Sequence, residues 1–281
     1  METGIARLLD VLDLEPIEVN IFRGGSLDET PQRVFGGQVA AQALVAAGRT
    51  VACGAVHSLH SYFLRPGDPH APILYEVDRI RDGRSFTTRR VVAIQHGEAI
   101  FNLQCSFHRA EDGLVHEDPM PPAPGPASIP TLGERVAGAA DTPSIFTSAH
   151  GLDIRFIDEL PWRRGEPRER EHLWLRAGQP IGDDPLVHAA VVTFASDLTL
   201  VDTILQRHGY SPWDESFLGA SLDHCMWFHR PFRADGWLFY DQTSPTASGA
   251  RGLAQGALYS ERGERVATMT QEGLVRFKAE A

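Results

Sequence analysis

A hydroxyl, a carboxylate and an imidazole lie within four residues of one another at Ser221, Asp223 and His224. These are the side-chain types that nucleophilic hydrolysis uses. Their spacing argues against a triad, because in a strand Ser221 and Asp223 share one face while His224 points to the other. Gly219 begins a nucleophile elbow, but the second glycine of Gly-x-Ser-x-Gly is missing. A serine hydrolase remains an alternative that a covalent serine inhibitor would settle.

Other catalytic and cofactor motifs are absent from the sequence. There is no His-Glu-x-x-His, no Walker lysine motif and no Gly-x-Gly-x-x-Gly. Cys53, Cys105 and Cys225 are far apart and form no Cys-x-x-Cys pair, so neither a disulfide framework nor structural zinc is expected. His60 and His229 are expected to satisfy polar needs near a sheet. We therefore predict no metal site and no cofactor.

Two segments are predicted to be buried helices. Residues 38–47 follow Gly36 and Gly37 and have small or apolar side chains nearly all round, which is typical of a buried helix. Residues 184–207 are mostly apolar and are also predicted to be helical. Three shorter elements complete the prediction, a helix over 5–14 and strands over 17–22 and 172–176.

Each buried helix is followed by strand candidates that are rich in Val, Ile, Phe and Tyr and separated by turn signals. In the first half they cover residues 56–64, 72–80, 85–96 and 99–108. In the second half they cover residues 220–230, 236–243, 247–259 and 265–277. The order of strand, buried helix and strand meander therefore occurs twice.

The two halves also share a sequence motif. Phe63-x-Arg-Pro lies in the stretch 57–66, and Phe228-x-Arg-Pro repeats it in the stretch 221–232. A long curved antiparallel sheet can bury one helix on its concave face, and two such units can pair their sheets edge to edge. We therefore predict an α+β fold, a double hotdog of two tandem units each wrapped around a central helix.

The segment between the halves is rich in proline. Six prolines occur between residues 118 and 130, which is typical of a stiff, solvated linker. We predict an N-terminal hotdog over 1–117, a linker over 118–150 and a C-terminal hotdog over 151–281. The polar residues of the two copies have diverged, so one half is expected to carry most of the chemistry.

Composition limits the partners. The 281 residues are 42% hydrophobic and carry a formal net charge of -11, which argues against nucleic acid as a general partner. A local arginine cluster could still bind an anionic ligand. No apolar run approaches the length of a membrane span, and the N-terminus lacks the pattern of a secretory signal. We therefore predict no membrane span and a cytoplasmic protein.

Six motifs occur in a characteristic order: Gly36-Gly-Gln, His57-Ser-Leu-His-Ser-Tyr-Phe-Leu-Arg-Pro-Gly, Asp82-Gly-Arg-Ser-Phe-Thr-Thr-Arg-Arg, Ala195-Ser-Asp-Leu, Asp223-His-Cys-Met-Trp-Phe-His-Arg-Pro-Phe and Gln271-Glu-Gly. With them the chain resembles the acyl-CoA thioesterase II family from about residue 5 to residue 277. The resemblance implies a double hotdog fold and an acyl-CoA substrate, hydrolysed to a free acid and coenzyme A. It also favours a homo-oligomer, and open sheet edges make association plausible.

The resemblance further implies a catalytic trio of Asp, Ser or Thr, and Gln in the second half. The matching positions here are Asp197, Ser221 and Gln271. Some relatives have Thr where this chain has Ser221, and both residues supply a hydroxyl. A carboxylate can accept a proton from water, and burial would raise its pKa. An amide can orient that water without competing for its proton, so no covalent intermediate is needed.

Substrate-binding candidates follow from the same chemistry. Coenzyme A carries phosphates, so arginines should gather at the mouth of an acyl tunnel. Arg89 and Arg251 are candidates because they occupy matching places after the repeated strands. Gly36 and Gly37 are candidates because free N–H groups at a helix start could stabilise an oxyanion.

Two other functions are compatible with this architecture. A hotdog hydratase or dehydratase for enoyl-CoA would use Asp and His five residues apart, but the residue five after Asp197 is Asp202. A non-enzymatic acyl-CoA-binding module should lack the trio or carry a DNA-binding segment. The trio is present and the sequence shows no basic helix-turn-helix.

Overall fold

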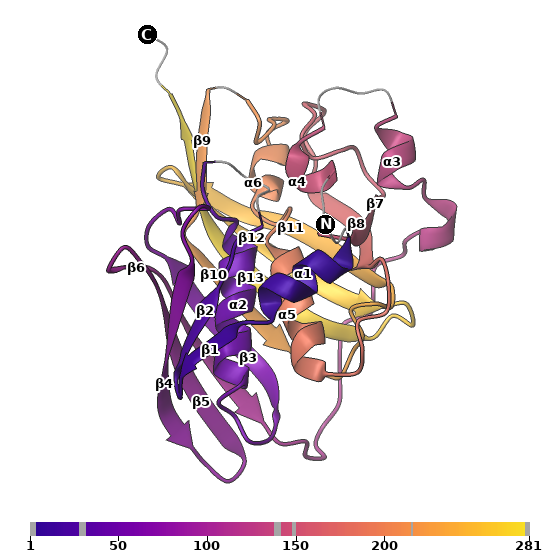
Figure 1. Ribbon diagram of the computed structural model, residues 1–281. Coiled ribbons are helices and arrows are strands. Elements are labelled where there is room, and N and C mark those ends of the chain that lie inside the picture. Colours follow the sequence, from indigo (N-terminus) through magenta and orange to yellow (C-terminus); the bar gives the residue numbers. More distant parts are fainter. Residues whose placement is uncertain (1–3, 28–31, 138–141, 148–149, 215, 279–281) are drawn as a thin grey trace.

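The computed structural model describes residues 4–27, 32–137, 142–147, 150–214 and 216–278 (Figure 1). The elements of the first half are α1 (Ile5–Leu12), β1 (Glu15–Glu18), β2 (Ile21–Gly24), α2 (Gly36–Gly48), β3 (Ala55–Phe63), β4 (Ile73–Asp82), β5 (Phe86–Gln95) and β6 (Glu98–His108). The segment that follows contains η1 (Pro126–Ser128), α3 (Leu132–Arg135) and α4 (Ser144–Thr147). The elements of the second half are β7 (Leu152–Phe156), β8 (Arg170–Ala177), α5 (Pro185–Ser196), α6 (Asp202–Gln206), β9 (Phe217–Ser221), β10 (Asp223–Phe228), β11 (Leu238–Ser248), β12 (Arg251–Ser260) and β13 (Arg265–Phe277).

One antiparallel sheet joins the two halves. Within the described residues its 13 strands run in the order β1-β2-β4-β5-β6-β3-β10-β13-β12-β11-β8-β7, and β9 pairs with β13 off this path. The halves meet where β3 pairs with β10, with Leu59 opposite Met226. The predicted α+β double hotdog, with two sheets joined edge to edge, is confirmed.

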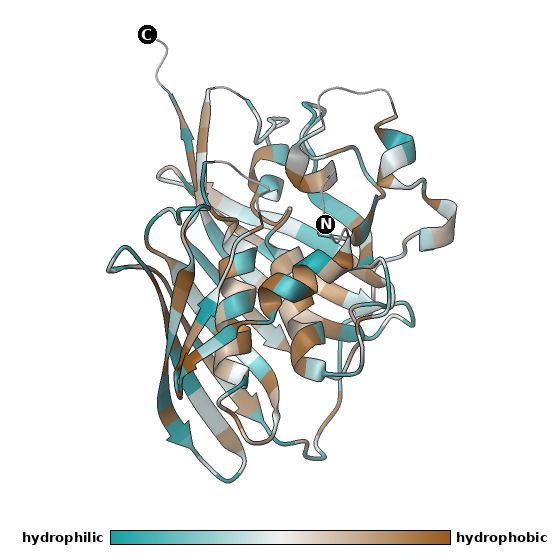
Figure 2. Cartoon of the chain, in the orientation of Figure 1, coloured by the Kyte–Doolittle hydropathy of each residue, from teal (hydrophilic) through white to brown (hydrophobic). Residues whose placement is uncertain are grey.

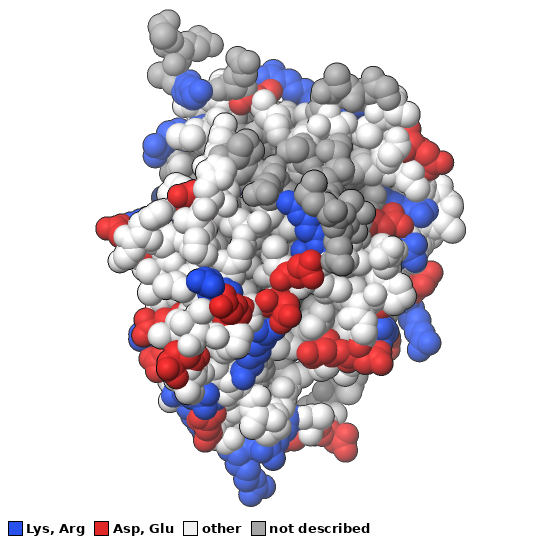
Figure 3. All heavy atoms as spheres, viewed as in Figure 1, with Lys and Arg blue, Asp and Glu red and all other residues white. Residues whose placement is uncertain are grey.

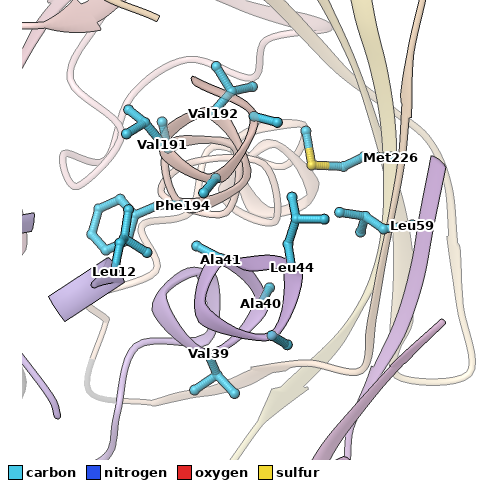
Figure 4. Close-up of a cluster of buried hydrophobic side chains, with 14 of the residues drawn as sticks. Leu12, Val39, Ala40, Ala41, Leu44, Leu59, Val191, Val192, Phe194 and Met226 are labelled. Carbon is cyan, nitrogen blue, oxygen red and sulfur yellow. The ribbon is translucent and has the colours of Figure 1, made fainter. Parts of the chain in front are cut away.

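The two buried helices α2 and α5 lie side by side against this sheet (Figures 1 and 4). Figure 2 colours α5 largely in the hydrophobic range, as its mostly apolar sequence requires. Alanines such as Ala40 and Ala41 are fully buried and allow the helices to approach closely. The first turn of α2 faces the last turn of α5, since a Cβ on Gly37 would lie 2.6 Å from the Phe194 carbonyl oxygen.

The opposite ends of these helices also touch. A Cβ on Gly48, the last residue of α2, would lie 2.5 Å from Cδ1 of Leu186 near the start of α5. The two helices therefore run antiparallel, and each has one end beside the other's opposite end.

The prediction of one continuous helix over 184–207 is wrong, because two separate helices occupy this range. Asp184 caps α5, its side chain accepting a hydrogen bond from the Leu186 N–H, and Pro185 follows at the first helical position. The helix then ends at Ser196 and a separate short helix, α6, begins at Asp202. In the turn between the two helices, a polar side chain bonds to the neighbouring sheet. Oγ1 of Thr199 donates to Oε1 of Gln242 on β11.

The proline-rich segment packs more closely than a solvated linker would. Pro126 and Ile129 are buried, and Ile129 belongs to a small apolar cluster with Trp174 and Phe239. The indole N–H of Trp174 donates to the Pro124 carbonyl oxygen at 2.9 Å. Most residues between 118 and 130 are exposed, as a solvated linker requires, but Pro126 and Ile129 attach the segment to the apolar outer surface of the sheet. The boundaries 1–117, 118–150 and 151–281 stay a prediction.

Candidate active site

The three residues of the predicted trio come together at the C-terminal end of α5. Asp197 is the C-cap residue that directly follows this helix. Its Oδ1 accepts a hydrogen bond from Nε2 of Gln271 at 2.5 Å and a longer one from Oγ of Ser221 at 3.4 Å. Gln271 is fully buried on β13, and Ser221 ends β9. A carboxylate, a hydroxyl and an amide thus converge from one helix end and two strands.

Ser221 faces inward because of an irregularity in the sheet. Ser221 pairs with Gly273 on β13, whereas Cys225 pairs with Thr270, so the register shifts by one residue around Leu222. Such a bulge reverses the alternation of side chains. The Asp223 carboxylate consequently accepts a hydrogen bond from the backbone N–H of Glu272.

His224 also lies on the inner face, so the expectation that it points away from Ser221 is wrong. Its imidazole is fully buried, and Nε2 lies 2.9 Å from the Ser196 hydroxyl on α5. The expectation assumed a regular strand, and the bulge at Leu222 removes that assumption. The imidazole meets Ser196, and Ser221 meets Asp197.

The first half of the chain contributes the start of α2. The backbone N–H of Gly37 is close enough to the Asp197 carboxylate to lower its pKa. A Cβ on Gly36 would lie 2.8 Å from Oδ2 of Asp197 and 2.7 Å from the Phe63 ring, so only glycine fits there without movement. The two predicted glycines therefore do lie at the trio.

Burial sets the electrostatics of Asp197. It raises the pKa of this carboxyl from 3.8 to about 6, against the opposing effects of hydrogen bonds from Gln271, Gly37 and Ser221. The carboxyl is therefore ionised at neutral pH and holds a proton more readily than an exposed aspartate. These are the properties of a general base.

Arg33 was missed by the sequence analysis. It precedes α2, and its positive charge lowers the pKa of Asp197. Its Nη2 also donates to the carbonyl oxygen of Gly219 on β9 at 3.4 Å. No motif singled it out, because its position depends on how the two halves meet.

The two predicted substrate-binding arginines differ in their surroundings. Arg89 is 1% exposed, and all five of its N–H donors are directed at acceptors of the protein itself, on Thr50, Arg81, Asp82 and Thr88. No donor is left for a phosphate, so the structure corrects this candidate to a structural residue. Arg251 is about half exposed, and its Nε donates to the Glu272 carboxylate at 3.0 Å. Glu272 directly follows Gln271 on β13.

A second set of acidic groups lies behind the trio. Burial raises the pKa of Glu171 on β8 from 4.5 to about 8. It also raises the pKa of Asp202 well above its ordinary value, and the charges of Glu171 and Asp197 add to that rise. Gln206 is close enough to oppose the rise for Glu171, although neither side chain makes a hydrogen bond of ordinary geometry. The interior near Asp197 therefore holds two further carboxyls.

The surface shows no charged patch on the face drawn in Figure 3 and no part of the trio in two of its hollows. Acidic and basic side chains are interspersed on the face drawn in Figure 3. Two surface hollows are lined by residues of the connecting segment and β7, including Thr131, Phe146 and Arg155, and by none of the trio. In the part of the chain that the structure describes, no His, Cys, Asp and Glu side chains group as a metal site would require. No helix of the described ranges has the length and apolar character to cross a membrane.

Two family descriptions match the chain. The description "Acyl-CoA thioesterase" matches residues 159–274, and "Acyl-CoA thioesterase N-terminal domain" matches residues 27–108. Among curated proteins, acyl-coenzyme A thioesterase 8 from Homo sapiens is 39% identical over 287 residues, which cover 95% of this chain and 88% of that protein. Acyl-CoA thioesterase 2 from Haemophilus influenzae is 34% identical and covers 99% of both chains.

Solved structures agree with these matches. The acyl-CoA thioesterase II TesB2 of Mycobacterium marinum superimposes with a TM-score of 0.80 at 42% identity, covering 98% of this chain and 99% of that one. A hot dog fold protein from Alicyclobacillus acidocaldarius has a TM-score of 0.80 at 18% identity, which supports the fold alone. The chain belongs to the acyl-CoA thioesterase II family and is an acyl-CoA thioesterase.

Proposed function

We propose that this thioesterase hydrolyses acyl-CoA with a water molecule held by Asp197, Ser221 and Gln271, without a covalent intermediate. The observation that supports this proposal is the convergence of Gln271 Nε2 and Ser221 Oγ on Oδ1 of Asp197. Two donors fix the carboxylate, and its raised pKa makes it a proton acceptor.

The reaction proceeds in two steps. Asp197 takes a proton from the water while the water oxygen bonds to the thioester carbonyl carbon, and the carbonyl electrons move to the oxygen. The oxyanion then re-forms the carbonyl and breaks the C–S bond. The leaving thiolate takes the proton from Asp197, and the carboxylic acid product releases its own proton to solvent. The start of α2, at Gly36 and Gly37, is the proposed source of partial positive charge near the oxyanion.

No observation favours the hydratase alternative. Its second residue would be a His five positions after Asp197, and Asp202 occupies that place. Burial raises the pKa of the Asp202 carboxyl well above its ordinary value, and a carboxyl cannot take the role of the missing imidazole. A binding module without catalysis would have no use for a hydrogen-bonded carboxylate with a raised pKa.

The choice between a general base and a nucleophile can be tested by isotope labelling. We expect the enzyme to release free thiol from a panel of acyl-CoAs that differ in chain length. In a single turnover in H₂¹⁸O, the acid product should contain one ¹⁸O atom and the peptide with Asp197 should contain none. Incorporation of ¹⁸O into Asp197 would instead indicate an anhydride intermediate and contradict the proposal.

The role of the hydroxyl gives a further prediction. Ser221→Ala should retain a slow reaction, with kcat reduced by roughly 10-fold, the scale of one lost hydrogen bond. Ser221→Thr should be nearly neutral, because it keeps the hydroxyl. The measurement is the rate of thiol release under saturating acyl-CoA. A large loss in Ser221→Thr would show that shape, rather than the hydroxyl, governs this position.

The remaining predictions about the chain are compatible with this function. Arg251 stays the candidate for contact with the phosphates of coenzyme A, since it is partly exposed beside the strand of Gln271. Homo-oligomer formation stays a prediction. A curated relative from Saccharomyces cerevisiae, 25% identical, is named "Peroxisomal acyl-coenzyme A thioester hydrolase 1", and a cytoplasmic location for this chain also stays a prediction.

A further inference from the structure

His224 and Gln271 face each other across two neighbouring strands. Cys225 on β10 pairs with Thr270 on β13. Continuing that antiparallel register by one residue places His224 opposite Gln271. Side chains opposite each other on one face of an antiparallel pair lie in contact distance. Both side chains are 0% exposed, so each must find its polar partners inside the protein.

Each of these side chains has one polar atom that is hydrogen-bonded and one buried polar atom that has no hydrogen bond among the described residues. Nε2 of Gln271 donates to Asp197, and Oε1 is buried without a hydrogen bond. Nε2 of His224 lies 2.9 Å from the Ser196 hydroxyl, and Nδ1 is buried without a hydrogen bond. The two remaining atoms, an acceptor on Gln271 and a possible donor on His224, belong to directly opposed residues.

We propose that His224 is a positioning residue of the reaction, whose Nδ1–H donates to Oε1 of Gln271 and fixes the amide with its NH₂ group toward Asp197. This inference rests on the proposed role of the trio. It adds a residue that does not touch the substrate. In this arrangement the order of contacts is Ser196, His224, Gln271 and Asp197.

The protonation of His224 agrees with this arrangement. Burial lowers the pKa of His224 to about 4, so the imidazole is neutral and carries one N–H. The interaction with Gln271 opposes that fall, which is the effect of an amide oxygen that accepts from the ring. The Ser196 hydroxyl lies 2.9 Å from both the Thr193 carbonyl oxygen, to which it can donate, and Nε2 of His224. The proposed tautomer requires its single proton to be directed to Nε2 of His224 instead of that carbonyl oxygen.

The amide orientation matters because the two ends of a glutamine amide have opposite effects on a carboxylate. The NH₂ group stabilises ionised Asp197, whereas the oxygen would repel it and raise its pKa further. Without a donor at Nδ1, Gln271 is free to turn its oxygen toward Asp197. The base would then be protonated at a pH where the parent enzyme is active.

The test compares His224→Leu with His224→Asn, whose amide nitrogen can replace Nδ1. The parent should lose kcat/KM below about pH 6, where Asp197 becomes protonated. In His224→Leu we expect this acid limb to move up by about one pH unit and kcat to fall with little change in KM. His224→Asn should return the limb toward that of the parent. The other charged or titratable groups near Asp197 are Arg33, Asp202 and Tyr240, and they are unchanged in both variants.

A matched control separates positioning from packing. His188 on α5 is also a buried histidine, bonded to the Gly182 carbonyl oxygen and the Ala234 N–H. His188→Leu should lose stability as His224→Leu does, but its acid limb should stay at the parent position. Equal limb shifts in both variants would overturn the inference.

Nuclear magnetic resonance of the unmodified enzyme provides a readout that needs no activity. The ¹⁵N shifts of His224 should report the tautomer with the proton on Nδ1. A proton on Nε2 would overturn the inference even if His224→Leu does not fold. If the parent hydrolyses acyl-CoA but the His224→Leu limb does not move, the inference fails and the proposed function stands. If the parent releases no thiol, the proposed function itself fails.

Discussion

Asp197→Asn is expected to reduce the turnover of acyl-CoA by about 100-fold or more, the scale of losing a general base. Asparagine preserves the shape of the side chain but accepts a proton far more weakly. The measurement is the rate of free-thiol release from a long-chain acyl-CoA. Asp183→Asn is a suitable control, because its side chain is 94% exposed beside Arg233. If Asp197→Asn hydrolyses acyl-CoA as fast as the parent, the assignment of the base is wrong.

At high pH, the same variant should be more stable than the parent. The pKa of Asp197 rises from 3.8 in the unfolded chain to about 6 in the folded protein. The folded state therefore binds the proton more tightly, and stability is lost as the pH increases through this range. Above pH 6 the ionised carboxyl costs roughly 3 kcal/mol at most, at about 1.4 kcal/mol per pKa unit. Denaturation of both proteins at pH 5 and pH 8 should show a larger difference in stability at pH 8, because only part of the loss has occurred at pH 5.

Glu171→Gln should increase stability at alkaline pH by a larger amount. Burial raises the pKa of Glu171 from 4.5 to about 8, so the folded state favours the protonated form. Stability from this group is fully present below pH 4.5 and is lost as the pH increases to about 8. The difference corresponds to roughly 4 to 5 kcal/mol at about 1.4 kcal/mol per pKa unit. Glutamine has no charge to bury, so the variant should avoid this loss.

The measurement is the free energy of unfolding from denaturant titrations at pH 5 and pH 9. Glu169→Gln serves as the control, because Glu169 is 86% exposed beside Arg207 and should leave the pH dependence unchanged. The same pH dependence in Glu171→Gln and the parent would mean that Glu171 is not the group that limits stability.

The sequence predicted the architecture because two strong signals agreed. The apolar helices had to be buried, and each was followed by a meander of strands that could bury it. The trio was predicted because its motifs identify the family, and Asp197, Ser221 and Gln271 do meet. Here local patterns carried enough information, since each motif marks one element of the site.

The errors share a physical cause, which is contact between distant parts of the chain. The inward position of His224 depends on a bulge at Leu222 that only the register with β13 reveals. Arg89 looked like a phosphate ligand, but two of its donors are used by Thr50, which is 39 residues away in the chain. The lateral hydrogen bond of Thr199, which accompanies the break between α5 and α6, is likewise long-range.

The antiparallel contact of α2 and α5 makes the two ends of the helix pair unequal. At one end the glycine-led start of α2 meets the Asp197 carboxylate. At the other end, the apolar side chain of Leu186 packs against Gly48. The two halves are related by internal pseudo-symmetry, so these two ends are equivalent positions of the scaffold. One of them carries the candidate active site, and the other is an apolar contact. A protein made of two copies of the first half would therefore lack Asp197. A protein made of two copies of the second half would lack the glycine-led start of α2 beside it.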